Sequence, residues 1–377
     1  MVVSEKLIDF KLKDFDPFRL KYILSACYQC SSCTSVCPLR RVSKFNPRKI
    51  IHNVLLDNHI SEDDLTTCLT CGLCLEICPQ QVDFPEFVRL SRVDMGISED
   101  MYAHHNIFNL MQIFMAEMTD TGMQFSYEGE LDQDSTIAYF PGCIDLFDRF
   151  LDLKKTNFHQ IGQSAINIMN KVGVKPNLLS LKCCGHDAYW TGDESAYEQV
   201  RDYNTQLIKK SGIKKLVVSC AECYYTFGKL YDLEIEVQHL SQFIIENKDR
   251  IEFKTENVPL TYHDACRLGR FMKEYDAPRK ALEATGAILK ELPLNKQFTK
   301  CCGVSAWLRC DDQSRAIMLK KLEEATQVVG NDGTLAVGCT KCFAHLNCVL
   351  EDKKPQHDFQ IKVKEIGMII NENITRR

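Results

Sequence analysis

The sequence predicts a multidomain protein in which an all-helical N-terminal domain precedes a duplicated α/β domain with parallel sheets. Three observations support this prediction. Two tight cysteine runs near the N-terminus enclose a helical hydrophobic pattern. A five-cysteine pattern recurs later at an interval of about 120 residues. Within each copy, β-type runs alternate with helical patterns. A chain of 377 residues has the length of two or three domains.

The cysteine content is the outlying feature of the composition. The chain has 20 cysteines, 45% hydrophobic residues and a formal net charge of -5. A large chain with tight Cys-x-x-Cys spacings favours metal ligation in a reducing compartment over a disulfide framework, which belongs to small secreted proteins. The charge balance gives no global basic field for nucleic acid or an anionic membrane.

The N-terminal residues and the apolar runs predict a cytoplasmic location. The first residues, MVVSEKLIDFKLKDFD, are mixed and charged and do not resemble a signal peptide. The most apolar run, IFNLMQIFM at 107–115, is far shorter than the ~20 residues that a spanning helix needs. We therefore expect any membrane association to come through a partner protein.

Two runs with the spacing C-x2-C-x2-C-x3-C-P define the N-terminal domain. They read CYQCSSCTSVCP at 27–38 and CLTCGLCLEICP at 68–79. This is the pattern of two-cluster bacterial ferredoxins, in which the fourth cysteine of each run binds the neighbouring cluster. The ligands expected for one 4Fe-4S cubane are Cys27, Cys30, Cys33 and Cys78, and those for the other are Cys68, Cys71, Cys74 and Cys37.

Zinc is the alternative metal. Each of the two runs, however, places four thiolates within eleven residues, which suits a cluster better than a zinc site, whose ligands usually come as two separated pairs. The segment between the runs predicts helices, since SEDDL at 61–65 has an acidic first turn. A helical stripe is formed by Ile50, Ile51, Val54, Leu55 and Leu56. The domain therefore resembles the helical ferredoxin module of succinate dehydrogenase and related iron-sulfur subunits.

These patterns divide the chain into four parts. A helical ferredoxin domain with two 4Fe-4S cubanes is expected over 1–100. A helical connector follows over 101–135, whose polar end, 120–135, is predicted to be a linker. The first Cys-Cys-Gly α/β domain is expected over 136–255 and the second over 256–377.

Each α/β domain carries five cysteines in the order C, CC, C-x2-C, and a glycine follows each adjacent pair. The first set is Cys143, Cys183, Cys184, Cys220 and Cys223, and the second set is Cys266, Cys301, Cys302, Cys339 and Cys342. Equivalent cysteines are 123, 118 and 119 residues apart, which indicates an internal duplication.

The elements around the cysteines repeat as well. Helices are predicted over 192–212 and 313–330, each ending at a glycine. The β-type runs TIAYFPGC and VPLTYHDAC end in a cysteine, and KKLVVS and TLAVG lead into Cys220 and Cys339. Cysteines at the carboxyl ends of parallel strands meet in the crevice where α/β sheets bind ligands.

Five thiolates at one place exceed the four that zinc or a simple cubane needs. A cluster with extra or bridging thiolates is therefore predicted for each copy. The glycine after each pair gives the backbone freedom to present two consecutive side chains to one cluster.

The order of these motifs resembles the D subunit of the heterodisulfide reductases, which is the fused counterpart of the separate C and B subunits. The resemblance covers about residues 18–365. It implies a catalytic iron-sulfur subunit in which two cubanes pass electrons to two noncubane 4Fe-4S clusters, one on each five-cysteine set. Those clusters reduce, or form, a disulfide such as that between coenzyme M and coenzyme B.

The same superfamily implies an alternative function. Iron-sulfur subunits of glycolate or lactate, glycerol-3-phosphate and succinate enzymes share these motifs and link a flavoprotein dehydrogenase to a quinone. Two complete five-cysteine sets favour the disulfide-reducing enzyme. Because no G-x-G-x-x-G follows a strand, electrons are expected from a partner: a b-type cytochrome, a flavoprotein or a ferredoxin.

Several polar residues near the cysteines have more than one interpretation. His186 and His263 are candidates to protonate a departing thiolate or to hydrogen-bond cluster sulfurs, as are the neighbouring Asp187 and Asp264; a structural role is the alternative. The residues that either bind an anionic thiol or lie on the surface are Lys182, Arg267, Arg270 and Lys341.

Two tryptophans and two cysteines complete the set of candidates. Trp190 and Trp307 follow the cysteine pairs and are either core anchors or walls of the cluster cavity. Cys310 and Cys348 lie outside every motif and are predicted to be small buried apolar residues.

Overall fold

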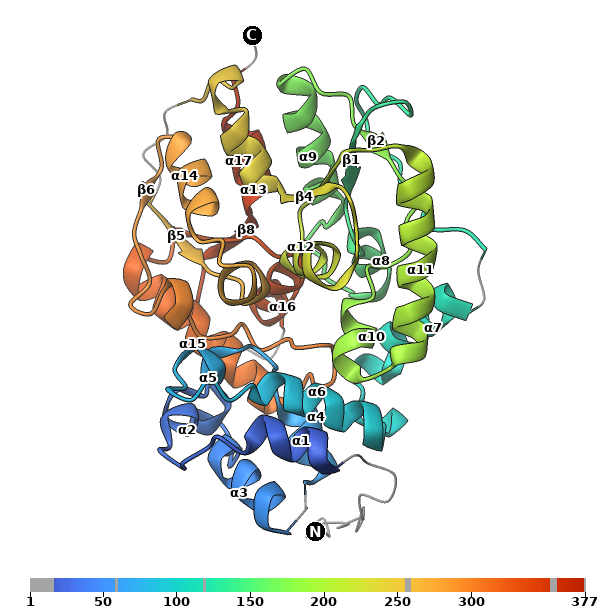
Figure 1. The fold of residues 1–377 in the computed structure, drawn as a ribbon. Helices are drawn as coiled ribbons and strands as arrows, with labels where there is room; N and C mark the ends of the chain where they lie inside the picture. Colours follow the sequence, from blue (N-terminus) through green and yellow to red (C-terminus); the bar gives the residue numbers. More distant parts are fainter. Residues whose placement is uncertain (1–16, 58–59, 118–119, 255–258, 353–357, 376–377) are drawn as a thin grey trace.

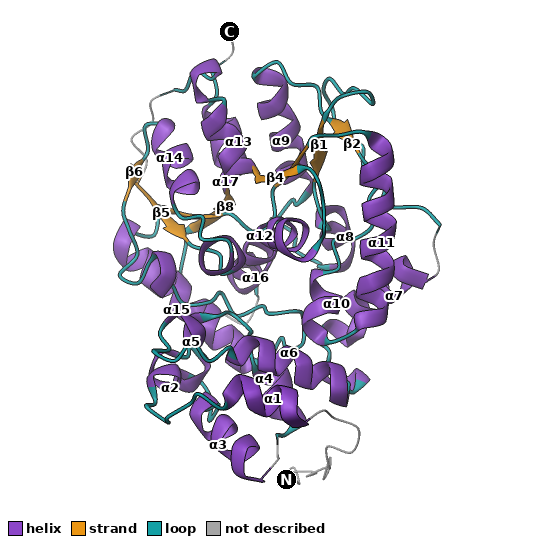
Figure 2. Ribbon diagram, in the orientation of Figure 1, coloured by secondary structure: helices purple, strands orange, loops and turns teal. Residues whose placement is uncertain are grey.

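The structure, a computed structural model, describes residues 17–57, 60–117, 120–254, 259–352 and 358–375. An all-helical N-terminal domain is followed by two α/β domains, each with a four-stranded parallel sheet (Figures 1 and 2). The predicted fold class is confirmed. The N-terminal domain, blue in Figure 1, lies beneath both α/β domains, which stand side by side.

Short helices form the N-terminal domain around the two cysteine runs. The predicted helix start at Ser61 is confirmed, because its hydroxyl accepts a hydrogen bond from the Asp64 N–H at 3.1 Å and so caps the first turn. The helices are α1 (Pro17–Leu24), α2 (Ser32–Val36), η1 (Leu39–Arg41), α3 (Pro47–Asp57), α4 (Glu62–Thr67), α5 (Leu73–Glu76) and α6 (Phe84–Met95).

The connector contains η2 (Glu99–Met101), η3 (His104–Asn106) and the apolar helix α7 (Ile107–Glu117). Residues 120–135 contain no helix or strand and are bound to the first α/β domain. The Met123 N–H donates to the Leu181 carbonyl at 2.9 Å, and the Asn170 amide bonds both the N–H and the carbonyl of Glu130. The polar segment thus lies on the first domain.

The two sheets have the same topology, with orders β2-β1-β3-β4 and β6-β5-β7-β8, all parallel. Their central strands are largely buried, as expected for parallel strands covered by helices on both faces. The strands are β1 (Ile137–Phe140), β2 (Asn177–Leu178), β3 (Lys215–Val218), β4 (Glu236–His239), β5 (Pro259–His263), β6 (Ile288–Leu289), β7 (Thr334–Val337) and β8 (Lys362–Glu365).

Helices cover the sheets and join the two α/β domains, since α17 packs on α9 and α13 packs on α14. The predicted helix ends at Gly212 and Gly330 are confirmed. The helices are α8 (Ile144–Phe150), α9 (His159–Lys171), α10 (His186–Thr191), α11 (Glu194–Ser211), α12 (Ala221–Tyr225), η4 (Thr226–Leu230), α13 (Leu240–Glu246), η5 (Lys248–Arg250), η6 (Arg267–Phe271), α14 (Asp276–Ala284), η7 (Lys296–Phe298), α15 (Asp312–Val329), α16 (Thr340–Glu351) and α17 (Ile366–Asn373).

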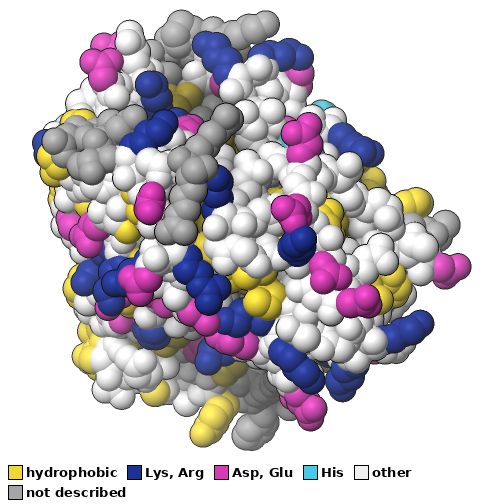
Figure 3. All heavy atoms as spheres, turned by 90° about the horizontal axis from the view of Figure 1, so that it is seen from above, with side chains coloured by type: hydrophobic (Ala, Val, Ile, Leu, Met, Phe, Trp, Pro, Cys, Tyr) yellow, Lys and Arg dark blue, Asp and Glu magenta, His cyan; other side chains and the backbone are white. Residues whose placement is uncertain are grey.

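The face of the α/β domains remote from the N-terminal domain carries basic and acidic side chains interspersed (Figure 3). This mixture agrees with the small net charge of -5. Among the described residues, the structure has no helix that is both long and apolar enough to cross a membrane.

Candidate metal centres

Four pockets collect the cysteines of the four predicted sets. In the N-terminal domain the fourth cysteines are exchanged between the runs: Cys78 lines a pocket with the first run, and Cys37 lines a pocket with the second. The two α/β sets line one pocket each. All twenty cysteines lie within the described residues and have free thiols.

The local backbone explains how each ferredoxin-type run presents its thiols. Each run ends in a short helix, α2 or α5, that begins after a residue with left-handed φ: Ser31 at 71° and Gly72 at 78°. This turn gathers the first three cysteines of the run. Cys37 then leaves α2 in an extended conformation and lies with the second run.

In the α/β domains, strand ends and the Cys-Cys-Gly turns bring the thiols together. Gly185 and Gly303 both have left-handed φ, 81° and 104°, a conformation that a side chain disfavours. Thiols from distant elements then meet, and the sulfurs of Cys143 and Cys183 are 3.4 Å apart. In the second domain Cys302 and Cys342 are 3.2 Å apart.

Contacts between the pockets arrange the four sets in a row. Cys74 lines both N-terminal pockets. The Cys301 thiol is hydrogen-bonded to Cys71 of the N-terminal domain. Cys220 and Cys339, which are equivalent in the two copies, are hydrogen-bonded to each other. The order is therefore first N-terminal set, second N-terminal set, second α/β set, first α/β set.

Buried arginines fix the junction between the N-terminal and second α/β domains. Arg270 donates to the carbonyls of Cys71 and Thr299 at 2.8 and 2.6 Å. The hydrogen bond with Cys301, followed by the charge of Arg270, lowers the pKa of Cys71 to about 6. The hydrogen bond with Cys301 likewise lowers the pKa of Cys266 to about 7. The same hydrogen bonds raise the pKa of Cys301 well above its usual value, so Cys301 is the proton donor of this group and Cys71 and Cys266 are the thiols that most readily become thiolates.

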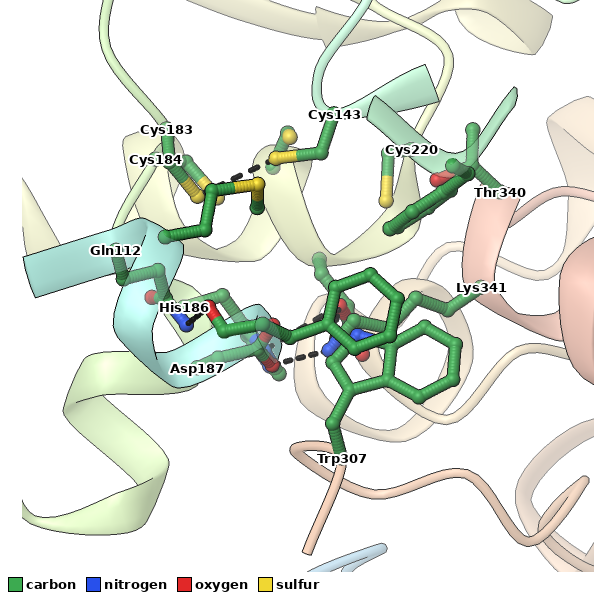
Figure 4. A pocket seen from close by; sticks show the side chains of 15 residues that line it. Gln112, Cys143, Cys183, Cys184, His186, Asp187, Cys220, Trp307, Thr340 and Lys341 are labelled. Carbon is green, nitrogen blue, oxygen red and sulfur yellow. Dashed lines mark hydrogen bonds and ion pairs between the residues drawn. The ribbon is translucent and has the colours of Figure 1, made fainter. Parts of the chain in front are cut away.

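An ion cluster lies beside the first α/β set (Figure 4), and its Glu222 also lines the pocket of the second set. Lys341 pairs with Asp187 and with Glu222, the latter at 3.1 Å. Glu222 and Lys341 occupy equivalent positions within their C-x2-C motifs. All three residues are buried. The pseudo-twofold relation thus pairs one acidic with one basic residue across the domain boundary.

His186 belongs to this cluster as a neutral ring. Its Nε2 accepts a hydrogen bond from Arg267 Nε at 2.9 Å, which assigns the proton to Nδ1, 3.3 Å from Asp187. Burial lowers the pKa of His186 to about 3. Arg267 also donates to the Thr70 carbonyl at 2.7 Å and lies over the Trp190 ring.

His263 lies in the second α/β set with a ring that suits a cluster. Both of its ring nitrogens are buried without a hydrogen-bond partner among the described residues, and the residue is 1% exposed. A ring nitrogen lies within 4.8 Å of the Cys302 and Cys342 sulfurs. A buried donor directed at sulfur fits an iron-sulfur cluster, whose sulfurs accept hydrogen bonds.

The remaining candidates have varied surroundings. Lys182, Arg267, Arg270 and Lys341 are all buried, so the surface alternative for these four residues is wrong. Asp264 is paired with Arg279 at 2.7 Å. Cys310 is exposed, contrary to the prediction, and Cys348 is half-buried.

The tryptophans divide between the two interpretations. Trp190 packs against Tyr225 and Ala306 in a small buried cluster and lines none of the cysteine pockets described above. Trp307 lines the pocket of the first α/β set, although it belongs to the second domain. Sequence reasoning missed Phe108, Phe147 and Glu222, which line the same pocket. Glu222 lies inside its C-x2-C motif, so its place between two candidate ligands was the available signal.

Comparison with known families agrees with this arrangement. Residues 26–82 match the 4Fe-4S dicluster domain, and residues 137–228 and 260–347 match the Cysteine-rich domain. The chain therefore belongs to the iron-sulfur proteins that join one dicluster domain to two cysteine-rich domains.

Within this class the chain resembles the D subunit of heterodisulfide reductase. It is 25% identical to the D subunit of the Dihydromethanophenazine:CoB--CoM heterodisulfide reductase of Methanosarcina barkeri, over 86% of this chain and 88% of that protein. An uncharacterized iron-sulfur protein of Methanococcus maripaludis is 25% identical over 97% of this chain and 76% of its own length. The EtfAB:quinone oxidoreductase of Syntrophomonas wolfei is 25% identical over 77% of this chain and 44% of that protein.

A crystal structure of a hypothetical protein from Helicobacter pylori has a similar fold, with a TM-score of 0.55 over 96% of this chain and 72% of that one. The two chains are 10% identical, so this likeness concerns the fold alone.

Proposed function

We propose that this chain is the catalytic iron-sulfur subunit of a heterodisulfide reductase-like complex that reduces, or forms, a disulfide. The two N-terminal sets would hold 4Fe-4S cubanes, and the two five-cysteine sets would hold noncubane 4Fe-4S clusters. Such clusters supply one-electron transfer, and reduction of a disulfide to two thiols takes two electrons and two protons.

The row of cysteine sets supports this proposal more than any other observation. Cys71 meets Cys301, and Cys220 meets Cys339, so neighbouring sets are in contact from the N-terminal domain to the first α/β domain. A partner that delivers electrons at the exposed Cys30 end would have a continuous route to the first α/β set. The pocket at that set is where a substrate could meet the thiols.

The surrounding residues would hold this route in place. Arg270 ties the second α/β domain to the backbone of Cys71, and Arg267 ties it to Thr70. His263, whose ring lies beside Cys302 and Cys342, is suited to hydrogen-bond a cluster sulfur rather than to act on a distant substrate.

The test is low-temperature EPR of anaerobically purified protein that is oxidised in the presence of one thiol at a time. A thiol-dependent paramagnetic signal supports disulfide chemistry. Four 4Fe-4S clusters require roughly sixteen iron atoms per chain. An iron content near the roughly eight atoms of two cubanes, with no thiol-dependent signal, contradicts the proposal.

The similarity to the EtfAB:quinone oxidoreductase favours a second candidate function. In that case the chain would transfer electrons between a flavoprotein and a quinone, and thiols would leave the EPR signals unchanged. Both functions require a protein partner, such as a b-type cytochrome, a flavoprotein or a ferredoxin. In either case we propose a cytoplasmic location, with the membrane reached only through that partner.

A further inference from the structure

The pocket of the first α/β set has an aromatic wall facing its cysteines (Figure 4). Trp307 stacks on Phe108 with ring centroids 4.3 Å apart, and Phe147 meets Trp307 edge-on at 5.7 Å. Phe108 comes from α7, Phe147 from α8, and Trp307 from the second α/β domain. Three distant segments thus form one apolar surface.

The polar groups of this pocket are engaged with one another. Lys341 pairs with Asp187, whose charge balances its own, and with Glu222, whose pKa burial raises well above its usual value. Gln112 accepts a hydrogen bond from the Ala188 N–H at 2.9 Å. Among the described residues that line the pocket, Lys341 is the only Lys or Arg, so an anionic ligand would find no unpaired cation there.

The Trp307 side chain adds one uncharged polar group to the aromatic wall. The Trp307 Nε1–H is buried and has no hydrogen-bond partner among the described residues. Buried donors of this kind usually find a partner. This donor is available to an acceptor such as a sulfur atom of a ligand or of a cluster.

The surface beside the pocket is also apolar. Leu110 and Phe114 on α7 and Phe150 at the end of α8 are 49%, 55% and 42% exposed. The Phe150 ring contacts Phe108, with centroids 6.4 Å apart. Exposed apolar side chains grouped beside a pocket are typical of sites that receive apolar ligands.

We propose that this pocket binds the uncharged, apolar part of a thiol or disulfide, with the aromatic cluster of Phe108, Phe147 and Trp307 as its apolar wall. The inference rests on the proposed function and names its substrate class. An aromatic thiol would gain stacking and buried apolar area. A sulfonate or phosphate would lose its hydration without gaining a free cation.

Two probe thiols test this inference on the anaerobically purified, cluster-loaded full chain. Benzyl mercaptan is uncharged and aromatic, whereas 2-mercaptoethanesulfonate carries a permanent negative charge. Each is titrated into oxidised protein while the EPR spectrum is recorded. We expect benzyl mercaptan to give its half-maximal spectral change at a concentration about tenfold lower or more.

Variants of Trp307 test whether the thiol binds at the aromatic wall. Trp307→Ala should raise the half-maximal concentration of benzyl mercaptan about tenfold and leave that of 2-mercaptoethanesulfonate unchanged, whereas Trp307→Phe keeps an aromatic wall and should stay near the parent. Phe298→Ala removes an exposed aromatic ring of the second α/β domain outside the pocket and serves as the control. Iron content confirms that each variant is loaded.

The outcomes separate the inference from the proposed function. If 2-mercaptoethanesulfonate acts at the same or a lower concentration in the parent protein, the substrate class is overturned while disulfide chemistry stands. If neither thiol changes the spectrum, the proposed function fails and the inference fails with it. The comparison in the parent protein remains decisive even if Trp307→Ala does not fold.

Discussion

The two α/β domains place the same five cysteines in different surroundings. In the first domain the set lies beside an aromatic pocket, whereas in the second Cys301 lies against Cys71 of the N-terminal domain. The strand order is the same in both sheets. The difference therefore does not arise from the order of the strands.

Two positions account for much of this difference. One and four residues after the first cysteine, the first domain has Ile144 and Phe147, and the second has Arg267 and Arg270. The apolar pair is buried, and Phe147 meets Trp307 of the second domain, while the arginines donate to carbonyls of the N-terminal domain. A duplicated unit can thus acquire a new neighbour through a few side chains while its cysteines stay in place.

The largest difference is expected from replacing the equivalent cysteines Cys301 and Cys183 by serine. Each replacement should cost about four iron atoms per chain, measured by iron analysis. Cys183→Ser removes the first α/β cluster and should leave the second reducible by the partner. Cys301→Ser removes the second cluster, which lies between Cys71 and the first α/β set, so it should prevent the partner from reducing the first cluster, as followed by EPR. Exposed Cys310→Ser is the control, and full iron in Cys301→Ser would contradict the ligand assignment.

A large effect on stability is expected from the ion cluster between the domains. Lys341→Met leaves Asp187 and Glu222 buried without their cation, which should cost about 3–5 kcal/mol in the free energy of unfolding. Denaturant titration under anaerobic conditions measures this loss. Adding Asp187→Asn and Glu222→Gln should recover part of it. A loss in Lys341→Met below about 1 kcal/mol would show that the cluster does not hold the domains together.

A smaller loss is expected at the arginine that distinguishes the second domain. Arg270→Gln removes buried hydrogen bonds from a charged donor to two carbonyls and should cost about 2–3 kcal/mol. Lys273→Gln is the matched control, because Lys273 also reaches the N-terminal domain, through Glu76, but is exposed. Its cost should stay below about 0.5 kcal/mol. Equal costs would mean that burial of Arg270 is not what matters.

The smallest change in stability, measured at pH 5, is expected from substitutions at His239 and Glu365, the last residues of β4 and β8. His239 and Glu365 both cap the following helix and are both fully buried. Burial raises the pKa of Glu365 to about 8, so the stability that its protonated form contributes should fall as pH rises from about 4.5 to 8. Burial lowers the pKa of His239, so its contribution should fall as pH drops below about 6.5.

Thermal unfolding across pH checks this contrast. Glu365→Gln should match the parent within about 1 kcal/mol at pH 5 and should lose less stability than the parent toward pH 8. His239→Gln should instead flatten the acid side of the curve. Parallel pH curves for the parent and Glu365→Gln would show that the carboxyl group does not titrate in this range.

Much of the fold followed from local sequence patterns. Cysteine spacing predicted the four sets, including the exchange of Cys37 and Cys78, because a tight loop restricts which thiols can meet. Glycines predicted the ends of α11 and α15, since they adopt left-handed or extended positive-φ backbone there. The strands β2 and β6 could not be predicted, because a run of two residues is too short to show the alternation of apolar and polar side chains that marks a strand.

The non-cysteine part of the candidate site could not be predicted in the same way. Lys341 and Asp187 stand 154 residues apart, and either one alone reads as an ordinary surface charge. The sequence gives no sign that Trp307 stacks on Phe108, because that contact depends on how α7 and the second domain meet. Patterns report local structure, whereas these contacts depend on the assembly of domains.

Side chains of each repeat line the cysteine pocket of the other repeat, and this arrangement indicates how such a protein arose. Lys341 lines the pocket of the first domain, and its equivalent Glu222 lines the pockets of both domains, so each repeat sends a side chain to the pocket of the other, as the subunits of a twofold dimer would. Trp307 lines the first pocket, but its equivalent Tyr189 does not line the second. Fusion of two copies into one gene lets each copy mutate independently, so a shared ancestral interface can become a one-sided site that neither repeat could form if expressed alone.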